Sequence, residues 1–185
     1  MMARIPYANP DLDDATRALA EQIRRERGGK VLNLYRMLLH SPPVAQGWLA
    51  MFTAIRQQAL LPGRYRELAI LRVAVINAAD YEFTQHIPFA LKDGVTQQQI
   101  DALRAGTMPA DFDARDRAVI DYAGAMTRDI RVPDALFEQI REGFSEREIV
   151  ELTATVAGYN LVSRFLEAME IDHEGAPESA PVARP

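Results

Sequence analysis

The stretch from residue 64 to residue 94 constrains this chain most, because it predicts two consecutive helices with charged groups among apolar ones. The first helix, about 64–78, is apolar almost all the way round. At about 100° per residue, Glu67 shares a stripe of this helix with Ile70 and Leu71. An unpaired buried carboxylate is costly and tends to be protonated, so this acid needs an explanation.

The second helix of this stretch is expected over about 81–92, after a break near Asp80, which we expect to cap it. Glu82 and His86 lie four residues apart and therefore on one face of this helix. The acid of the first helix and the imidazole of the second are the best candidates for chemistry in the chain.

The rest of the chain also predicts helices. Asn9-Pro10 is typical of a helix start, and Thr96–Gln99 and Ser145–Glu148 have the spacing of capping boxes. No alternating apolar and polar run indicates a strand. We therefore predict an all-α, single-domain multi-helix bundle. Its helices are expected over about 10–27, 31–39, 43–60, 64–78, 81–92, 96–106, 114–127, 133–142 and 145–169.

The composition changes after Ile171, where the remaining residues include three prolines and little that could be buried. Such a segment cannot compensate the entropy of ordering by burying apolar surface. We therefore predict a helical domain over 1–171 and a disordered tail over 172–185.

Composition and charge exclude several classes of function. The formal net charge of −5 argues against a nucleic-acid surface. The absence of cysteine excludes disulfides and thiolate metal sites, and Glu82 with His86 would be too few ligands for a metal. The longest apolar run, 68–79, is too short to span a bilayer, and the first residues lack the apolar region of a secretory signal. We expect no metal and a soluble, cytoplasmic protein.

Residues 64–105 resemble the carboxymuconolactone decarboxylase and alkylhydroperoxidase D-like family. The shared pattern is a Glu-bearing apolar helix, a short break, a helix with Glu and His four apart, and a Gly-x-Thr start to the next helix. Residues 158–169, GYNLVSRFLEAM, also look like a terminal helix of members without cysteine. The resemblance implies an alkylhydroperoxidase D-like helical fold and a homo-oligomer, often a dimer, trimer or hexamer.

The resemblance also implies where thiols would lie. Peroxidase members carry a C-x-x-C pair, a His four residues after the second cysteine, and a Glu nineteen residues before that His. Glu67 and His86 keep this spacing, but the two cysteine positions fall on Ala79 and Glu82. Thiol-based peroxide reduction is therefore excluded, because no other side chain supplies that nucleophile and redox couple.

The decarboxylase branch of the family needs neither a thiol nor a cofactor. The resemblance implies loss of carbon dioxide from a small carboxylated lactone or related organic acid, followed by proton delivery to carbon. His86 is the expected proton donor or oxyanion partner. Glu67 or Glu82 would orient it, and Glu82 could itself be the acid. For an anionic substrate, Arg72 and Arg164 are candidate ligands and Tyr81 a candidate pocket residue.

Simpler interpretations remain open at this point. His86 could be a core or interface histidine satisfied by Glu82 across one turn. Glu67 could belong to a buried ion pair with Arg64, or with an arginine of another helix. On that interpretation the chain is a non-catalytic helical oligomer that binds a metabolite or a protein partner.

Overall fold

Helices make up the regular structure of residues 3–108 and 110–175, which the computed structural model describes, and no strand occurs in these residues. The prediction of an all-α fold is confirmed. Nine α-helices lie in the described residues, with a π-helical turn, η1 (Ala54–Gln58), between the third and the fourth. They are α1 (Asp14–Glu26), α2 (Asn33–Leu38), α3 (Pro42–Thr53), α4 (Gly63–Ile76), α5 (Asp80–Lys92), α6 (Gln97–Arg104), α7 (Ala114–Asp129), α8 (Asp134–Gly143) and α9 (Glu146–Met169).

The helices group into two compact units. The described residues up to Arg56, together with those from Leu166 on, form the first unit, and residues 57–165 form the second. The predicted boundary between a helical domain and a tail at residue 171 stays a prediction.

The first unit joins the two ends of the chain. In it α1 and α2 both pack against α3. The carboxylate of Asp172 accepts hydrogen bonds from the Ala3 backbone N–H, at 3.1 Å, and from the Tyr7 hydroxyl, at 3.2 Å. Burial raises the pKa of Tyr7 to about 12, so its hydroxyl remains a donor at neutral pH. These hydrogen bonds therefore connect the segment before α1 with the segment that follows α9.

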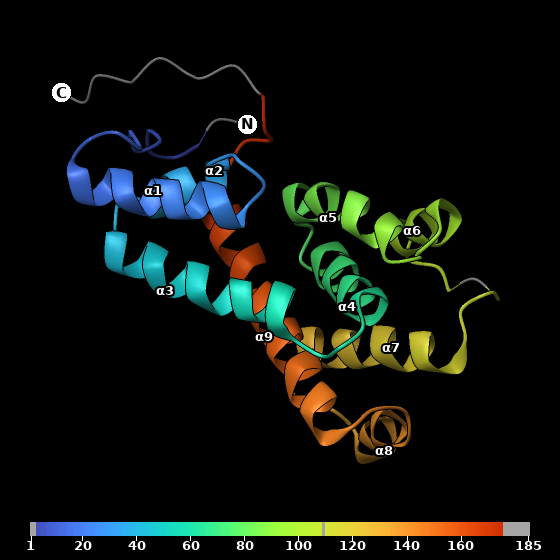
Figure 1. Cartoon of the computed structure of the whole chain (residues 1–185). Helices are drawn as coiled ribbons and strands as arrows, with labels where there is room; N and C mark the ends of the chain where they lie inside the picture. The colour runs from blue at the N-terminus through green and yellow to red at the C-terminus, as the bar shows by residue number, and fades with distance from the viewer. Residues whose placement is uncertain (1–2, 109, 176–185) are drawn as a thin grey trace. The chain divides into compact units, whose positions relative to one another are not determined.

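The second unit is built around α4, which packs against α5, α6 and α7 (Figure 1). Leu68, Ile70, Leu71 and Val73 of α4 are fully buried. A helix that is apolar on all sides is stable in water only when neighbours cover every face, which explains why α4 lies at the centre.

Arg64 ties the start of α4 to the start of α7. Its guanidinium donates to the buried carboxylate of Asp116 through two nitrogens, Nε to Oδ1 at 2.9 Å and Nη2 to Oδ2 at 2.6 Å. It also donates to Gln99 of α6 at 3.2 Å. Asp116 and Gln99 are at the same time members of capping boxes, so one arginine joins three helix starts.

The signals for helix starts were correct at two places and wrong at two others. The capping boxes at Thr96–Gln99 and Ser145–Glu148 are present. Asn9, however, accepts from the N–H of Asp11 in a turn, and α1 begins only at Asp14, capped by Asp13. The expectation for Asp80 was also wrong, because the N-cap of α5 is Ala79.

Part of the predicted disordered tail makes hydrogen bonds. Glu174 accepts from the Asn33 backbone N–H at 2.9 Å, and the Asn33 side chain donates to the Asp172 carbonyl at 3.1 Å. The composition could not reveal these partners, which lie near the other end of the chain, and the predicted tail over 172–185 stays a prediction. The remainder of the predicted tail, 176–185, lies outside the described residues.

No helix in the described ranges has both the length and the apolar character that a membrane crossing requires.

Candidate functional site

The turn between α4 and α5 positions the two predicted catalytic groups. Ala78 has a φ of 53° in this turn, an uncommon conformation for a residue with a side chain. The turn places α5 against α4. As a result, the Glu67 carboxylate of α4 meets the His86 imidazole of α5 across the interface between the two helices.

Glu67 and His86 form a short, buried hydrogen bond. The His86 Nδ1 atom lies 2.7 Å from Glu67 Oε2, and the two residues are 6% and 1% exposed. An ionised carboxylate only accepts, so Nδ1 of the ring carries the hydrogen and Nε2 is the nitrogen that can exchange a proton. The spacing of nineteen residues therefore corresponds to a direct contact.

Arg66 and Asp93 extend this pair. Arg66 donates from Nε to Glu67 Oε1 at 3.1 Å and from Nη2 to Asp93 Oδ2 at 2.9 Å. Both oxygens of the Glu67 carboxylate thus have a donor. The sequence suggests, as an alternative, an ion pair between Glu67 and Arg64. This interpretation is wrong, because Arg64 pairs with Asp116 of α7 and Glu67 pairs with Arg66.

The charge of Glu67 follows from these contacts. Burial acts to raise the pKa of its carboxyl, but the charges and hydrogen bonds of His86 and Arg66 together outweigh burial. The pKa of Glu67 therefore lies below its ordinary value, and the group is ionised at neutral pH.

Gly63 makes room for Asp93 at the outer end of this chain of contacts. A Cβ at residue 63 would lie well inside van der Waals contact of the Asp93 carboxylate. A glycine at the first position of α4 therefore allows Asp93 to reach Arg66.

Glu82 lies one turn before His86 and is 2% exposed. The Ser163 hydroxyl of α9 lies 3.1 Å from each oxygen of the Glu82 carboxylate and 2.9 Å from the Tyr159 carbonyl oxygen. The Tyr159 ring meets the His86 ring edge to face, with centroids 4.9 Å apart. One turn of α9 therefore contacts both of the candidate groups on α5.

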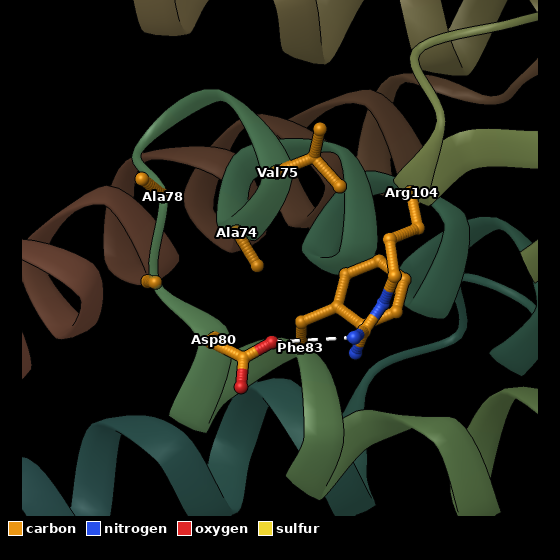
Figure 2. Close-up of a pocket in the computed structure, with 7 residues that line it drawn as sticks. Ala74, Val75, Ala78, Asp80, Phe83 and Arg104 are labelled. Carbon is orange, nitrogen blue, oxygen red and sulfur yellow. Dashed lines mark ion pairs between the residues drawn. The ribbon is translucent and has the colours of Figure 1, made fainter. Parts of the chain in front are cut away.

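An open pocket of about 160 Å³ lies beside the start of α5 (Figure 2). Most of its lining residues are apolar, and the lining also contains an ion pair between Asp80 and Arg104 (Figure 2). The Arg104 guanidinium lies over the Phe83 ring at 4.4 Å. Ala79, where the first cysteine of peroxidase members would lie, is one of the lining residues. The lining consists of Ala74, Val75, Ala78, Ala79, Asp80, Phe83 and Arg104.

The predicted substrate ligands lie elsewhere. Arg72 is five residues beyond Glu67 on α4, and its guanidinium lies near Gly124 of α7. Arg164 donates to the carbonyl and side-chain oxygens of Asn160 on its own helix, both at 3.0 Å. Tyr81 is buried and does not line the pocket beside α5. Their predicted roles in substrate binding stay predictions.

Sequence reasoning missed Arg66, Asp93, Ser163 and Arg104. Arg66 directly precedes Glu67, but residues next to each other on a helix do not usually face each other. Asp93, Ser163 and Arg104 meet partners that lie far away along the chain. A signal did exist for Gly63, since glycine at the first turn of an apolar helix is unfavourable unless another group approaches closely. In the described ranges, no three His, Asp or Glu residues gather as a metal site would require.

Comparison with known proteins agrees with the fold and with the central helices. Residues 42–125 match the family model described as "Carboxymuconolactone decarboxylase family". A curated relative, the uncharacterized protein YdfG of Bacillus subtilis (strain 168), is 29% identical over 106 residues, which cover 56% of this chain and 72% of that protein.

Solved structures share the fold over nearly the whole chain. An uncharacterized peroxidase-related protein from Ralstonia eutropha JMP134, described as an alkylhydroperoxidase AhpD core, has a TM-score of 0.81 at 22% identity and covers 95% of this chain and 94% of its own. A similar protein from Silicibacter sp. TM1040 has a TM-score of 0.78 at 24% identity, covering 93% and 91%.

A debrominase is among the similar structures. This protein, Bmp8, was solved as a cysteine-to-alanine variant in complex with 2,3,4-tribromopyrrole, and has a TM-score of 0.78 at 16% identity, covering 96% of this chain and 95% of its own. Similarity to solved structures at such low sequence identity shows a shared fold but not a shared activity. The match over residues 42–125 shows that the central helices are similar to the carboxymuconolactone decarboxylase family, and the chain itself contains no cysteine.

Proposed function

We propose that this protein is a cofactor-free acid–base enzyme that decarboxylates, or transfers a proton on, a small carboxylated lactone or related organic acid. The observation that carries the proposal is the buried hydrogen bond between His86 Nδ1 and the ionised Glu67 carboxylate. With Nδ1 held in this way, Nε2 is the ring nitrogen that gives and takes the proton.

The chemistry needs one proton donor and one acceptor of negative charge. When the carboxylate leaves as carbon dioxide, the electrons of the broken carbon–carbon bond remain on the substrate as a dienolate. The imidazolium form of His86 gives its Nε2 proton to carbon, which completes the exchange, and the neutral ring then recovers a proton from water. Glu67 is a positioning residue in this scheme, because it holds the ring and stabilises its positive form.

Glu82 has a separate place in the proposal. It lies on the same face of α5 as His86 and is held at Ser163. A carboxyl group at this place either orients His86 or serves itself as the acid that delivers the proton. Arg164 and Tyr81 are the proposed ligands of the anionic substrate, and the protein is proposed to be cytoplasmic and homo-oligomeric.

The experiment compares His86→Ala with the wild type on a panel of carboxylated lactones and keto acids, measuring carbon dioxide release and deuterium uptake at carbon. We expect kcat to fall about 10²- to 10⁴-fold, the usual contribution of a general acid. His40→Ala is the matched control, because it removes one imidazole from an exposed helix end. If His86→Ala retained full turnover on every substrate that responds, the role of His86 would be refuted.

A second candidate function is a non-catalytic helical oligomer that binds a metabolite or a protein partner. It is favoured by the chain of contacts from His86 through Glu67 and Arg66 to Asp93, which would also stabilise a scaffold with no reaction to perform. The structure of Bmp8 with 2,3,4-tribromopyrrole supports small-molecule binding on this fold. Robust turnover that is lost in His86→Ala would eliminate this candidate.

A further inference from the structure

The helices α4 and α7 pack against each other (Figure 1), and two arginines converge at this contact. Arg72 of α4 and Arg128 of α7 both reach the side of α7 at Gly124. From the position that a Cβ of Gly124 would take, Arg128 Nη1 lies 3.3 Å away, Arg72 Nε 3.6 Å and Arg72 Nη2 3.8 Å. Both guanidinium groups therefore lie within 4 Å of a single point.

This pair of cations is not neutralised by nearby carboxylates. Among residues 3–108 and 110–175, neither guanidinium forms an ion pair, and the buried Nε of Arg72 has no hydrogen-bond partner. Asp121 is near enough to act on the charge of Arg72 but does not pair with it. Burial, followed by the charge of Arg128, lowers the pKa of Arg72, which remains a cation at neutral pH.

A buried donor without an acceptor costs stability unless a ligand or water satisfies it. Guanidinium groups form their strongest hydrogen bonds with carboxylate and phosphate oxygens, often through two parallel N–H donors. Arg128 is exposed and Arg72 half-buried, so an anion can reach both from solvent. We propose that Arg72 and Arg128 form a binding site for a small oxyanion, the carboxylate or phosphate group of a metabolite, beside Gly124.

This site is separate from the Glu67–His86 pair. Five residues along α4 correspond to about 140° of rotation from Glu67, so Arg72 leaves the helix on a different side. Glu67 contacts α5, whereas Arg72 lies against α7. The oxyanion site therefore does not depend on the proposed reaction at His86.

Gly124 is the third part of the site. Its missing side chain lets the two guanidinium groups come close to the backbone of α7, inside a helix where alanine is otherwise the better residue. Gly124→Ala is therefore expected to stabilise the ligand-free protein while it weakens anion binding. If Gly124 had only a structural role, Gly124→Ala would change the stability and leave anion binding unchanged.

The test titrates the full-length protein with sodium phosphate and, separately, with malonate at constant ionic strength, using calorimetry and the shift of the thermal unfolding midpoint. We expect at least one anion to bind and to raise the midpoint beyond the effect of sodium chloride. Arg128→Gln and the conservative Arg72→Lys should each weaken this binding about ten-fold or more. Arg25→Gln, an exposed arginine of α1, is the charge-matched control and should bind as the wild type does.

The comparison of phosphate with malonate tells which oxyanion the site prefers. His86→Ala should bind the anion unchanged, which separates this site from the proposed catalytic pair. The proposal is overturned if neither anion exceeds chloride, if binding survives both arginine variants, or if His86→Ala abolishes it. It is also overturned if Arg128→Gln lowers the sedimentation mass, because the arginines would then pair with carboxylates of a second copy.

Discussion

Glu67 is a carboxylate in an otherwise apolar helix, and its neighbours decide its charge more than its burial does. Burial alone would favour the protonated acid, whereas His86 and Arg66 keep it ionised. The acid-side stability of the protein should therefore depend on this residue. A group whose pKa is lowered on folding contributes stability above its unfolded pKa, and that stability is lost as the pH falls through its folded pKa.

Glu67→Gln should lower the free energy of unfolding at pH 7 by about 3 kcal/mol, because buried donors of His86 and Arg66 lose their charged partner. The difference from the wild type should shrink as the pH falls below about 4.3, the ordinary pKa of glutamate, and should disappear below the lowered folded value. Urea unfolding between pH 3 and pH 7 measures both effects.

The control for this prediction is Glu138→Gln, which removes an exposed carboxylate paired with Arg141. Its effect should stay within about 0.5 kcal/mol at every pH, as is usual for exposed pairs. Parallel pH profiles for the wild type and Glu67→Gln would contradict the ionised state of Glu67 in the folded protein.

Ile130 shows backbone strain at the end of α7. This β-branched residue has a φ of 66° and is 84% exposed, so its side chain gains little from burial while its backbone is unfavourable. Ile130→Gly should raise the free energy of unfolding by about 1 kcal/mol, since relief of the strain exceeds the added flexibility of the unfolded chain. Thermal unfolding tests this, and Ile130→Val, which keeps the strain, should change little.

At the scale of elements, the start of α4 and the end of α5 are matched to each other. Gly63 gives space to the Asp93 carboxylate, Asp93 holds Arg66, and Arg66 holds Glu67. The candidate site therefore depends on a close approach of two helix ends as well as on the helix faces that carry Glu67 and His86.

Gly63→Ala should destabilise the protein by about 1–3 kcal/mol, the usual cost of overpacking, because the added methyl displaces Asp93 from Arg66. In an Asp93→Ala background the same change should be neutral or stabilising, since the clash is gone and alanine favours helix. A double-mutant cycle by urea unfolding measures this coupling. If Gly63→Ala lowered the free energy of unfolding equally in both backgrounds, the Asp93 carboxylate would not be the reason why residue 63 must be a glycine.

At the scale of the whole molecule, the two ends of the chain are held together in the first unit. Asp172 binds Ala3 and Tyr7, and Glu174 binds Asn33, all across more than a hundred residues of sequence. Contacts of this separation stabilise the folded chain but are invisible to local sequence patterns.

A chain that ends at Ile171 should be less stable than one that ends at Gly175. The shorter chain loses the hydrogen bonds of Asp172 and Glu174, each worth about 1 kcal/mol net. Denaturant unfolding of the two chains tests this directly. Identical midpoints would support the predicted end of the helical domain at residue 171.

The sequence by itself determined the helical class, most helix positions and two capping boxes, whereas the link between Glu67 and His86 was implied by a resemblance. These features depend on local periodicity and on neighbours within two helices, which a linear pattern records. The tertiary structure alone decided that Arg66 and not Arg64 holds Glu67, that Ser163 reaches Glu82, and that Arg72 meets Arg128 at Gly124. Which of several chemically equivalent arginines meets a given carboxylate depends on how helices pack in three dimensions, and residue type does not encode that choice.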